Sequence, residues 1–316
     1  MRGRDANVPA RYRRFMATRT VTAGTFLPVL AATLAIAFFS GMDAVMKGLT
    51  LAIGTYNAIF WRMLVGLALS AIVYLGSRKS WPSRSTMRIH VIRAAVSTVM
   101  AIAFFWGLAR VPMAEAIALT FVAPLIALYL AALLLVETVG RRAVIASMIG
   151  FAGVVVIVGS RAAAGGERDL WGAASLLVSA GLYAYNIILM RQQALVAGPV
   201  EVAFFQNLIV ASLLLLAAPF LAIPPGPEHW PTITFAALLA FVSLLLFAWA
   251  YARAEAQKLA PLEYTALIWA ALFGFLVFGE QVTWSTLVGA SLIIGGCLLA
   301  ARGGKPAGAP QAEAAL

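Results

Sequence analysis

Charged residues are scarce in this sequence, and cysteine is almost absent. Only 11% of the residues are charged while 63% are hydrophobic, whereas soluble proteins average about 25% charged residues. A water-soluble fold of 316 residues could not bury that much apolar side chain. The composition therefore excludes a soluble enzyme, a disordered protein and a coiled coil, and it indicates that lipid surrounds most of the chain.

Residues and motifs for catalysis are also few. The single cysteine, Cys297, excludes a disulfide framework and a multi-thiolate metal site. The two histidines, His90 and His229, lie near the ends of apolar runs and form no zinc site or nucleophile pair. The only Gly-Gly-Lys, at 303–305, runs into a proline instead of completing a P-loop, and no G-x-S-x-G is present. We therefore predict a protein that is not an enzyme, with no catalytic residue, cofactor or metal ion.

Long apolar runs are abundant. A helix needs about 20 apolar residues to cross a bilayer core of about 30 Å. Ten runs near that length are joined by short polar segments, and none shows the two-residue alternation of a membrane β-strand. We predict an all-α integral membrane protein with ten transmembrane helices. The runs cover 20–42, 49–77, 94–109, 116–136, 143–160, 170–190, 202–223, 229–252, 264–279 and 281–301.

The two ends of the chain read as tails. Residues 1–24 are rich in arginine and residues 303–316 in glycine, proline and alanine. The apolar run that follows the first tail is longer than a usual signal-peptide core and shows no convincing cleavage signature, so we predict that it is the first helix. Two units of five spans, 25–160 and 161–302, lie between the tails.

Positive charge is distributed unevenly among the loops. With the N-terminus inside, 18 of the 23 lysines and arginines fall on the inner side, four fall on the outer side, and Arg62 lies within a span. This bias predicts cytoplasmic termini in a bacterial inner membrane. It also explains the net charge of +11 without nucleic acid, which we exclude as a partner.

The two halves of the sequence match each other at an offset of 143 residues. Because each unit has five spans, the second unit is predicted to enter the membrane inverted, which is typical of secondary transporters with a site near the midplane. The most specific matches place Phe104 on Phe247, Trp106 on Trp249, Arg110 on Arg253, Glu137 on Glu280 and Gly153 on Gly296, and an offset of 144 places Lys47 on Arg191.

In these features the chain resembles the drug/metabolite transporter superfamily, and its EamA-type members in particular. The resemblance covers about 25–302 and rests on the paired five-helix units, the glutamates that close spans 4 and 9, the small-residue spans 5 and 10, Lys47 at the end of span 1, and Arg62 in span 2. It implies a basket of helices around a central cavity, with spans 3, 4, 8 and 9 prominent in the wall. Bacterial amino-acid exporters of the YddG type are the members that it resembles most. Gln206 stands at the position equivalent to Arg62, so the basic residue is not duplicated.

Four charged residues are placed in the outer half of the predicted spans. Asp43 and Lys47 are four residues apart, in the order that favours an ion pair. Arg62 lies about eight residues into span 2, or roughly 12 Å deep, and Glu115 lies near the outer end of span 4. This neutral set could bind a zwitterion, hold an outer gate, or carry a proton through Asp43 or Glu115. The alternative is that the four residues pair with each other and hold helices together.

Several uncharged residues are further candidates for binding or gating. Trp106 and Trp249 fit either an interfacial aromatic belt or two symmetric gates. Buried Asn186 should face a cavity or another helix. Pro124 should release the carbonyl of Thr120, either toward a cavity or in a simple kink. The remaining candidates, deeper in spans 6 and 9, are Tyr183, Tyr264 and Trp269.

Other repeated residues are expected to be structural. We assign this role to Glu137 and Glu280, because inversion places them at opposite faces, and to Arg110 and Arg253. The motifs Ala146-x-x-x-Gly150 and Ser285-x-x-x-Gly289 predict close helix packing within each half, or a face for a homo-oligomer.

Together these features predict a secondary transporter that exports small amphipathic metabolites across the inner membrane by alternating access. Amino acids, aromatic and other neutral ones included, are the favoured substrates. The alternative is an exporter of drugs or cationic compounds, which unpaired Asp43 and Glu115 carboxylates would favour. A channel or a membrane-embedded enzyme fits less well, because the inverted repeat argues against an enzyme and no polar stripe marks a pore.

Overall fold

The protein is all-helical throughout the part that the computed structural model describes, residues 26–77, 81–135, 141–163, 167–254 and 259–301, which confirms the predicted fold class. The helices are α2 (Phe26–Ile53), α3 (Thr55–Gly76), α4 (Arg84–Leu108), α5 (Met113–Thr120), α6 (Ala123–Leu135), α7 (Arg141–Ala163), α8 (Glu167–Ala194), α9 (Pro199–Leu215), α10 (Ala218–Leu221), η1 (Pro227–His229), α11 (Trp230–Tyr251), η2 (Ala260–Thr265), α13 (Ala266–Phe278) and α14 (Trp284–Ala301).

Eight helical segments are long and apolar enough to cross a membrane. Two shorter apolar helices, Pro199–Leu215 and Trp284–Ala300, occupy the places of the seventh and tenth predicted spans. Eight of the ten predicted spans therefore reach full crossing length in the described residues.

The first helix differs most from its predicted bounds. The uninterrupted apolar run stops at Met42 and Lys47 was predicted to end the span, but α2 continues to Ile53 and buries both Asp43 and Lys47. It ends at Gly54, whose positive φ of 81° suits a residue without a side chain. Lys47 therefore lies inside the bundle and does not end a helix, and its partners, Val111 and Glu280, lie in the segments that follow α4 and α13.

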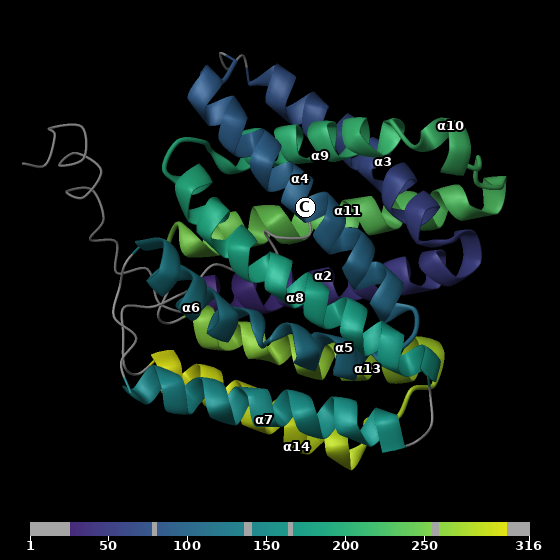
Figure 1. Ribbon diagram of the computed structural model, residues 1–316. Coiled ribbons are helices and arrows are strands. Elements are labelled where there is room, and N and C mark those ends of the chain that lie inside the picture. The colour runs from purple at the N-terminus through teal and green to yellow at the C-terminus, as the bar shows by residue number, and fades with distance from the viewer. Residues whose placement is uncertain (1–25, 78–80, 136–140, 164–166, 255–258, 302–316) are drawn as a thin grey trace, which may run out of the picture.

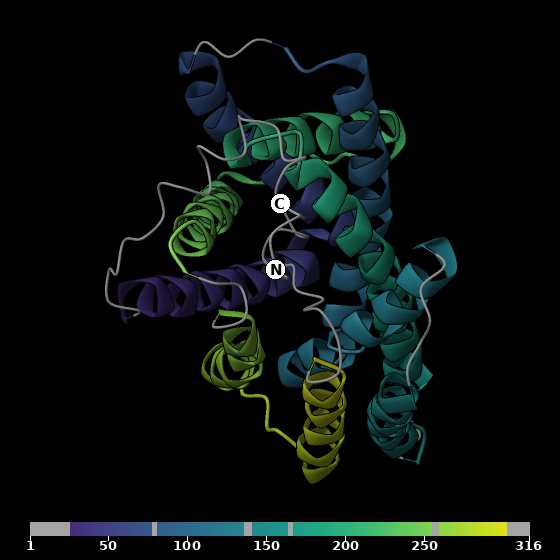
Figure 2. The same ribbon diagram turned by 90° about the vertical axis from the view of Figure 1, so that its left-hand side faces the viewer.

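Equivalent helices of the two halves pack reciprocally. In one contact, α2 of the first half packs on α11 of the second half. In the other, the equivalent of α2, which is α8, packs on the equivalent of α11, which is α4. Two further contacts join equivalent helices directly, α3 to α9 and α7 to α14. Both views place α14, drawn in yellow, at the lower edge of the bundle and α9 at the upper edge (Figure 1; Figure 2).

These two direct contacts are built from different side chains. Between α3 and α9 the ring of Tyr74 stacks on that of Phe204, with 4.6 Å between centroids. Between α7 and α14 the backbones touch, because a Cβ atom on Gly153 would lie 2.4 Å from the carbonyl oxygen of Gly289. The glycines of α7 and α14 thus join the two halves. Gly150 faces Leu125 of α6 in its own half, but a Cβ atom on Gly296 of α14 would also lie 3.0 Å from the Gly150 nitrogen. The prediction of packing within each half is therefore incomplete for Gly150 and wrong for Gly289, because α14 has its partner helix in the other half.

Candidate functional site

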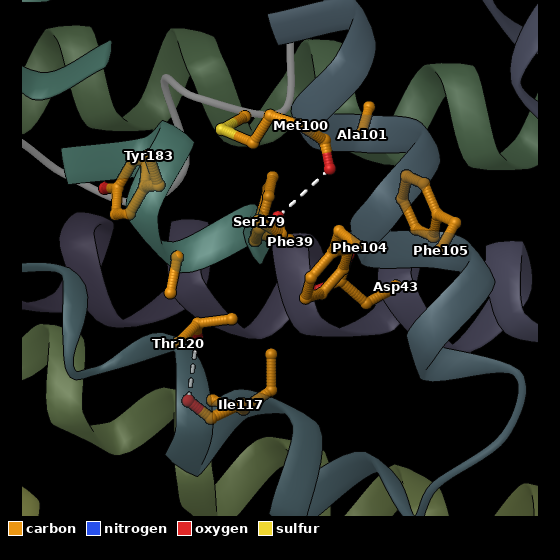
Figure 3. Close-up of a pocket in the computed structure, with 11 residues that line it drawn as sticks. Phe39, Asp43, Met100, Ala101, Phe104, Phe105, Ile117, Thr120, Ser179 and Tyr183 are labelled. Carbon is orange, nitrogen blue, oxygen red and sulfur yellow. Dashed lines mark hydrogen bonds between the residues drawn. The ribbon is translucent and has the colours of Figure 1, made fainter. Parts of the chain in front are cut away.

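A cavity of about 490 Å³ lies where α2, α4, α5 and α8 meet. Met100, Ser179 and Thr120 border the same space from three of these helices (Figure 3). These helices are spans 1, 3, 4 and 6, so the expected wall of spans 3, 4, 8 and 9 is half right. The lining consists of Phe39, Asp43, Met100, Ala101, Phe104, Phe105, Ile117, Thr120, Ser179, Ala180 and Tyr183.

Two of the three hydroxyl groups in the lining, those of Ser179 and Thr120, already donate their hydrogens to backbone carbonyls. Ser179 Oγ donates to the carbonyl of Met100 across the α4–α8 contact, at 3.0 Å. Thr120 Oγ1 donates to the carbonyl of Ile117 one turn earlier, at 2.8 Å. Each oxygen therefore offers the cavity lone pairs and no hydrogen.

Asp43 is the only acidic or basic residue among the described residues that line the cavity. Its side chain is buried, at 1% exposure. Neither carboxylate oxygen accepts a hydrogen bond from the described residues. Arg62, buried on α3, exerts an electrostatic attraction on this carboxylate but is not part of the lining. Because a buried carboxylate without donors is costly, Asp43 is the strongest candidate for a ligand contact.

Lys47 pairs with the other half of the chain, and the expected pair with Asp43 does not form. Its Nζ donates to the carboxylate of Glu280 and to the carbonyl of Val111, at 2.7 Å. The second oxygen of Glu280 accepts the backbone N–H of Met113 at 2.8 Å. Glu280 thus connects the end of α13 to α2 and to the start of α5. This agrees with the structural role expected of it, whereas Glu137 lies outside the described residues.

Local backbone geometry explains how Glu280 reaches these partners. Gly279 ends α13 in the left-handed conformation, with a φ of 66°. The N–H of Glu280 then donates to the carbonyl of Gly274 at 3.0 Å, and that of Gly279 to the carbonyl of Phe275 at 3.0 Å. The Gly279 bond is the single bond of an αL C-cap, and this turn points the next side chain back at α5.

Glu115 is also paired. Its Oε2 accepts hydrogen bonds from Arg161 Nε at 2.8 Å and Nη2 at 2.6 Å. Arg161 reaches Asp169 as well, at 3.4 Å. The group joins α5, α7 and α8 outside the cavity lining. Of the two carboxylates considered for a cationic substrate, the structure leaves Asp43 alone available.

The repeated Trp and Arg residues form the same local structure in each half. Arg110 lies over the ring of Trp106 with its guanidinium carbon 3.4 Å from the centroid, and Arg253 lies over Trp249 at 4.3 Å. Each arginine also donates to the carbonyl of its own tryptophan, at 2.7 and 3.3 Å respectively. These contacts stabilise the ends of α4 and α11, as expected for Arg110 and Arg253. Neither tryptophan belongs to the cavity lining.

The expected interruption at Pro124 is present. α5 stops at Thr120 and α6 begins at Ala123. The Sγ of Cys297, on α14, donates to the carbonyl of Phe121 at 3.2 Å and is hydrogen-bonded to Tyr264. A thiol of the opposite half therefore satisfies a carbonyl in this break. This role of Cys297 had no signal in the sequence.

The other candidates contribute to packing. Asn186 is fully buried and accepts a hydrogen bond from Ser97 at 3.5 Å, so it faces α4, which is one of the two alternatives predicted for it. Trp269 stacks on Phe273 along α13, with 6.2 Å between centroids. Three of the predicted site residues line the cavity, namely Asp43, Thr120 and Tyr183.

A second polar cluster, not predicted from the sequence, joins α4, α8 and α9. Arg93 Nη1 donates to the amide oxygen of Gln193. The amide nitrogen of Gln193 must then donate to His90 Nδ1, at 2.6 Å. The remaining ring nitrogen of His90 lies 3.3 Å from the carboxylate of Glu201. The hydrogen bonds of Gln193 thus link Arg93 and His90 of α4 to α8, and His90 links α4 to Glu201 of α9.

Replacing Gln193 with leucine is expected to lower the free energy of unfolding by about 1–3 kcal/mol, because buried donors and acceptors of Arg93 and His90 lose this partner. Gln206→Leu is the matched control. Gln206 is equally buried, but its Oε1 accepts no hydrogen bond from the described residues, so we expect a smaller loss. Unfolding in detergent measures both, and equal losses would contradict the assignment.

Comparison with known proteins agrees with this architecture. The profile of the EamA-like transporter family matches residues 26–159 and again residues 170–302. The riboflavin transporter of Vibrio cholerae is 29% identical over 240 residues, which cover 73% of this chain and 78% of the relative. The pseudopaline exporter CntI of Pseudomonas aeruginosa is 23% identical over 280 residues, covering 87% and 95%.

Two further comparisons cover most of the chain. The S-adenosylmethionine uptake transporter of Rickettsia bellii is 24% identical over 265 residues, which cover 81% of this chain and 86% of the relative. A protein of known crystal structure superposes with a TM-score of 0.58 at 21% identity, covering 86% of this chain and 96% of that chain. The structural likeness concerns the fold alone.

Proposed function

This chain belongs to the EamA-like transporter family, and we propose that it is a secondary transporter that carries small amphipathic metabolites through the cavity at Asp43. The family and the named relatives indicate a multi-pass membrane transporter of small molecules and not an enzyme. The observation that carries the proposal is a buried carboxylate without hydrogen-bond donors, aimed into an apolar cavity inside the bundle.

We propose alternating access as the transport mechanism. The reciprocal packing of equivalent helices supports two related arrangements of the halves. The distribution of positive charge supports cytoplasmic termini in the inner membrane. Because the sequence has no P-loop, a gradient of the substrate or of a coupled ion would supply the energy. Export is the direction that the family resemblance suggests.

Amino acids with aromatic or apolar side chains are the first substrate class to test. The cavity walls suit an apolar side chain, and Asp43 suits the ammonium group. Cationic compounds are the second class. Two facts about the described residues favour them: no lysine or arginine lines the cavity, and neither oxygen of Asp43 accepts a hydrogen bond. The relatives are named for three different metabolites, so family membership alone does not choose between these classes.

Liposomes that contain only this protein test the proposal. They are loaded with labelled aromatic amino acids or with labelled aromatic amines, and efflux is followed with and without a pH gradient. Saturable efflux above that of protein-free liposomes supports a transporter, and its response to the gradient identifies proton coupling. Efflux that rises linearly with concentration would contradict alternating access and favour a channel. Gln206→Leu, which lies outside the cavity lining, should transport normally.

A further inference from the structure

The cavity offers hydrogen-bond acceptors on at least three of its lining side chains. The two oxygens of Asp43 accept no hydrogen bond from the described residues. The hydroxyls of Ser179 and Thr120 have committed their hydrogens to backbone carbonyls. These four oxygen atoms come from α2, α5 and α8, so a ligand that carries several N–H donors complements them.

No lysine, arginine or histidine is among the described residues that line the cavity, so the lining offers an anion no cation. Lys47 is bound to Glu280 and the Val111 carbonyl, and Arg161 is bound to Glu115 and Asp169. Arg62 acts electrostatically on Asp43 from α3 but contributes nothing to the lining. A carboxylate that entered the cavity would therefore lose its hydration without gaining a cation, which is costly.

Aromatic rings form much of the wall. Phe39 comes from α2, Phe104 and Phe105 from α4, and Tyr183 from α8. Ring faces attract ammonium groups, and aromatic rings combined with a carboxylate are a typical environment for an organic cation. The same rings pack against an aromatic or aliphatic body.

From these three observations we infer that the cavity selects monocationic amines with an aromatic body, whose ammonium group binds Asp43, in preference to zwitterionic amino acids. This inference rests on the proposed transport function and narrows its substrate class. The discriminating feature is the substrate carboxylate, which an amine lacks and an amino acid must desolvate.

Three ligands with the same ring test the inference: 2-phenylethylamine, phenylalanine and 2-phenylethanol. Binding to the purified full-length protein is measured by calorimetry, and saturable efflux is measured in liposomes. We expect the amine to bind about tenfold more tightly than either other ligand. The alcohol lacks the charge-assisted hydrogen bond, and phenylalanine has to desolvate its carboxylate. This ranking is obtained on the unmodified protein, so it holds even if a variant fails to fold.

Asp43→Asn should remove the preference. We expect its affinity for the amine to fall about tenfold while its affinity for the alcohol is unchanged, and the retained alcohol binding would show an intact cavity. Asp169→Asn is the matched control, since Asp169 lies on α8 outside the lining and contacts Arg161. It should bind all three ligands as the unmodified protein does.

The outcomes separate this inference from the proposed function. Phenylalanine that binds and moves as well as the amine would overturn amine selectivity and leave the transporter in place. An unchanged amine affinity in Asp43→Asn would overturn the role of that carboxylate. Absence of saturable efflux for every amine and amino acid tested would overturn the proposed substrates themselves.

Discussion

Replacing Glu280 with glutamine is expected to lower the free energy of unfolding by about 3–5 kcal/mol, because it leaves a buried charge without its partner. The Lys47 side chain is only 5% exposed, and Glu280 is the anion that it contacts. The substitution also replaces the charged acceptor of the Met113 N–H. Chemical or thermal unfolding of the purified protein in detergent measures the loss.

Two further variants make this result specific. Glu228→Gln removes a carboxylate that is 68% exposed beside His229, so we expect a change of no more than about 0.5 kcal/mol. Adding Lys47→Met to Glu280→Gln should recover much of the stability, since the unpaired charge is then gone. A Glu280→Gln loss as small as that of Glu228→Gln would show that the pair does not hold the helices together.

The adjacent glycines of α14 are expected to respond to alanine in opposite directions. A Cβ atom on Gly295 would meet nothing within 4 Å, whereas one on Gly296 would lie 2.5 Å from the carbonyl oxygen of Ala146 on α7. Gly295→Ala should therefore raise stability by up to about 1 kcal/mol through helix propensity. Gly296→Ala should lower it by about 1–3 kcal/mol through overpacking.

The same unfolding measurement compares the two alanine variants. Both add one methyl group to the same helix, so the gain in helix propensity cancels in the comparison. The difference between them isolates the contact between α7 and α14. Parallel shifts of the two variants would contradict backbone contact between these helices.

The helical fold and the family could be predicted because lipid imposes a simple rule on sequence. Each span must be apolar and about 20 residues long, and a repeat that brings Trp, Arg and Glu into register is specific even in an apolar chain. The end of the first span could not be predicted, because charge normally marks a helix end. Lys47 remains inside α2 since its partner, Glu280, lies 233 residues away, and a pairing of that range leaves no local pattern.

The cavity could be predicted only through its polar members. Asp43, Thr120 and Tyr183 stand out in an apolar sequence, and the structure places all three in the lining. Phe39 and Met100 line the same space, but their residue types also occur on surfaces that face lipid. Only the packing of four helices distinguishes them. Similarly, the glycine motifs predicted close packing, but not which helix would be the partner.

The α7–α14 and α3–α9 contacts differ in the groups that a sliding motion of one half against the other would have to separate. At the α7–α14 edge, Gly153 and Gly289 bring two backbones together, and Ile293 and Ile157 of the facing helices lie over these glycines. A shift along the helix axes there would drive isoleucine side chains against backbone. At the α3–α9 edge, the rings of Tyr74 and Phe204 are stacked at an angle of 8°, and the same shift would have to part them. Sliding of one half against the other is therefore opposed by backbone contact at one edge and by ring stacking at the other.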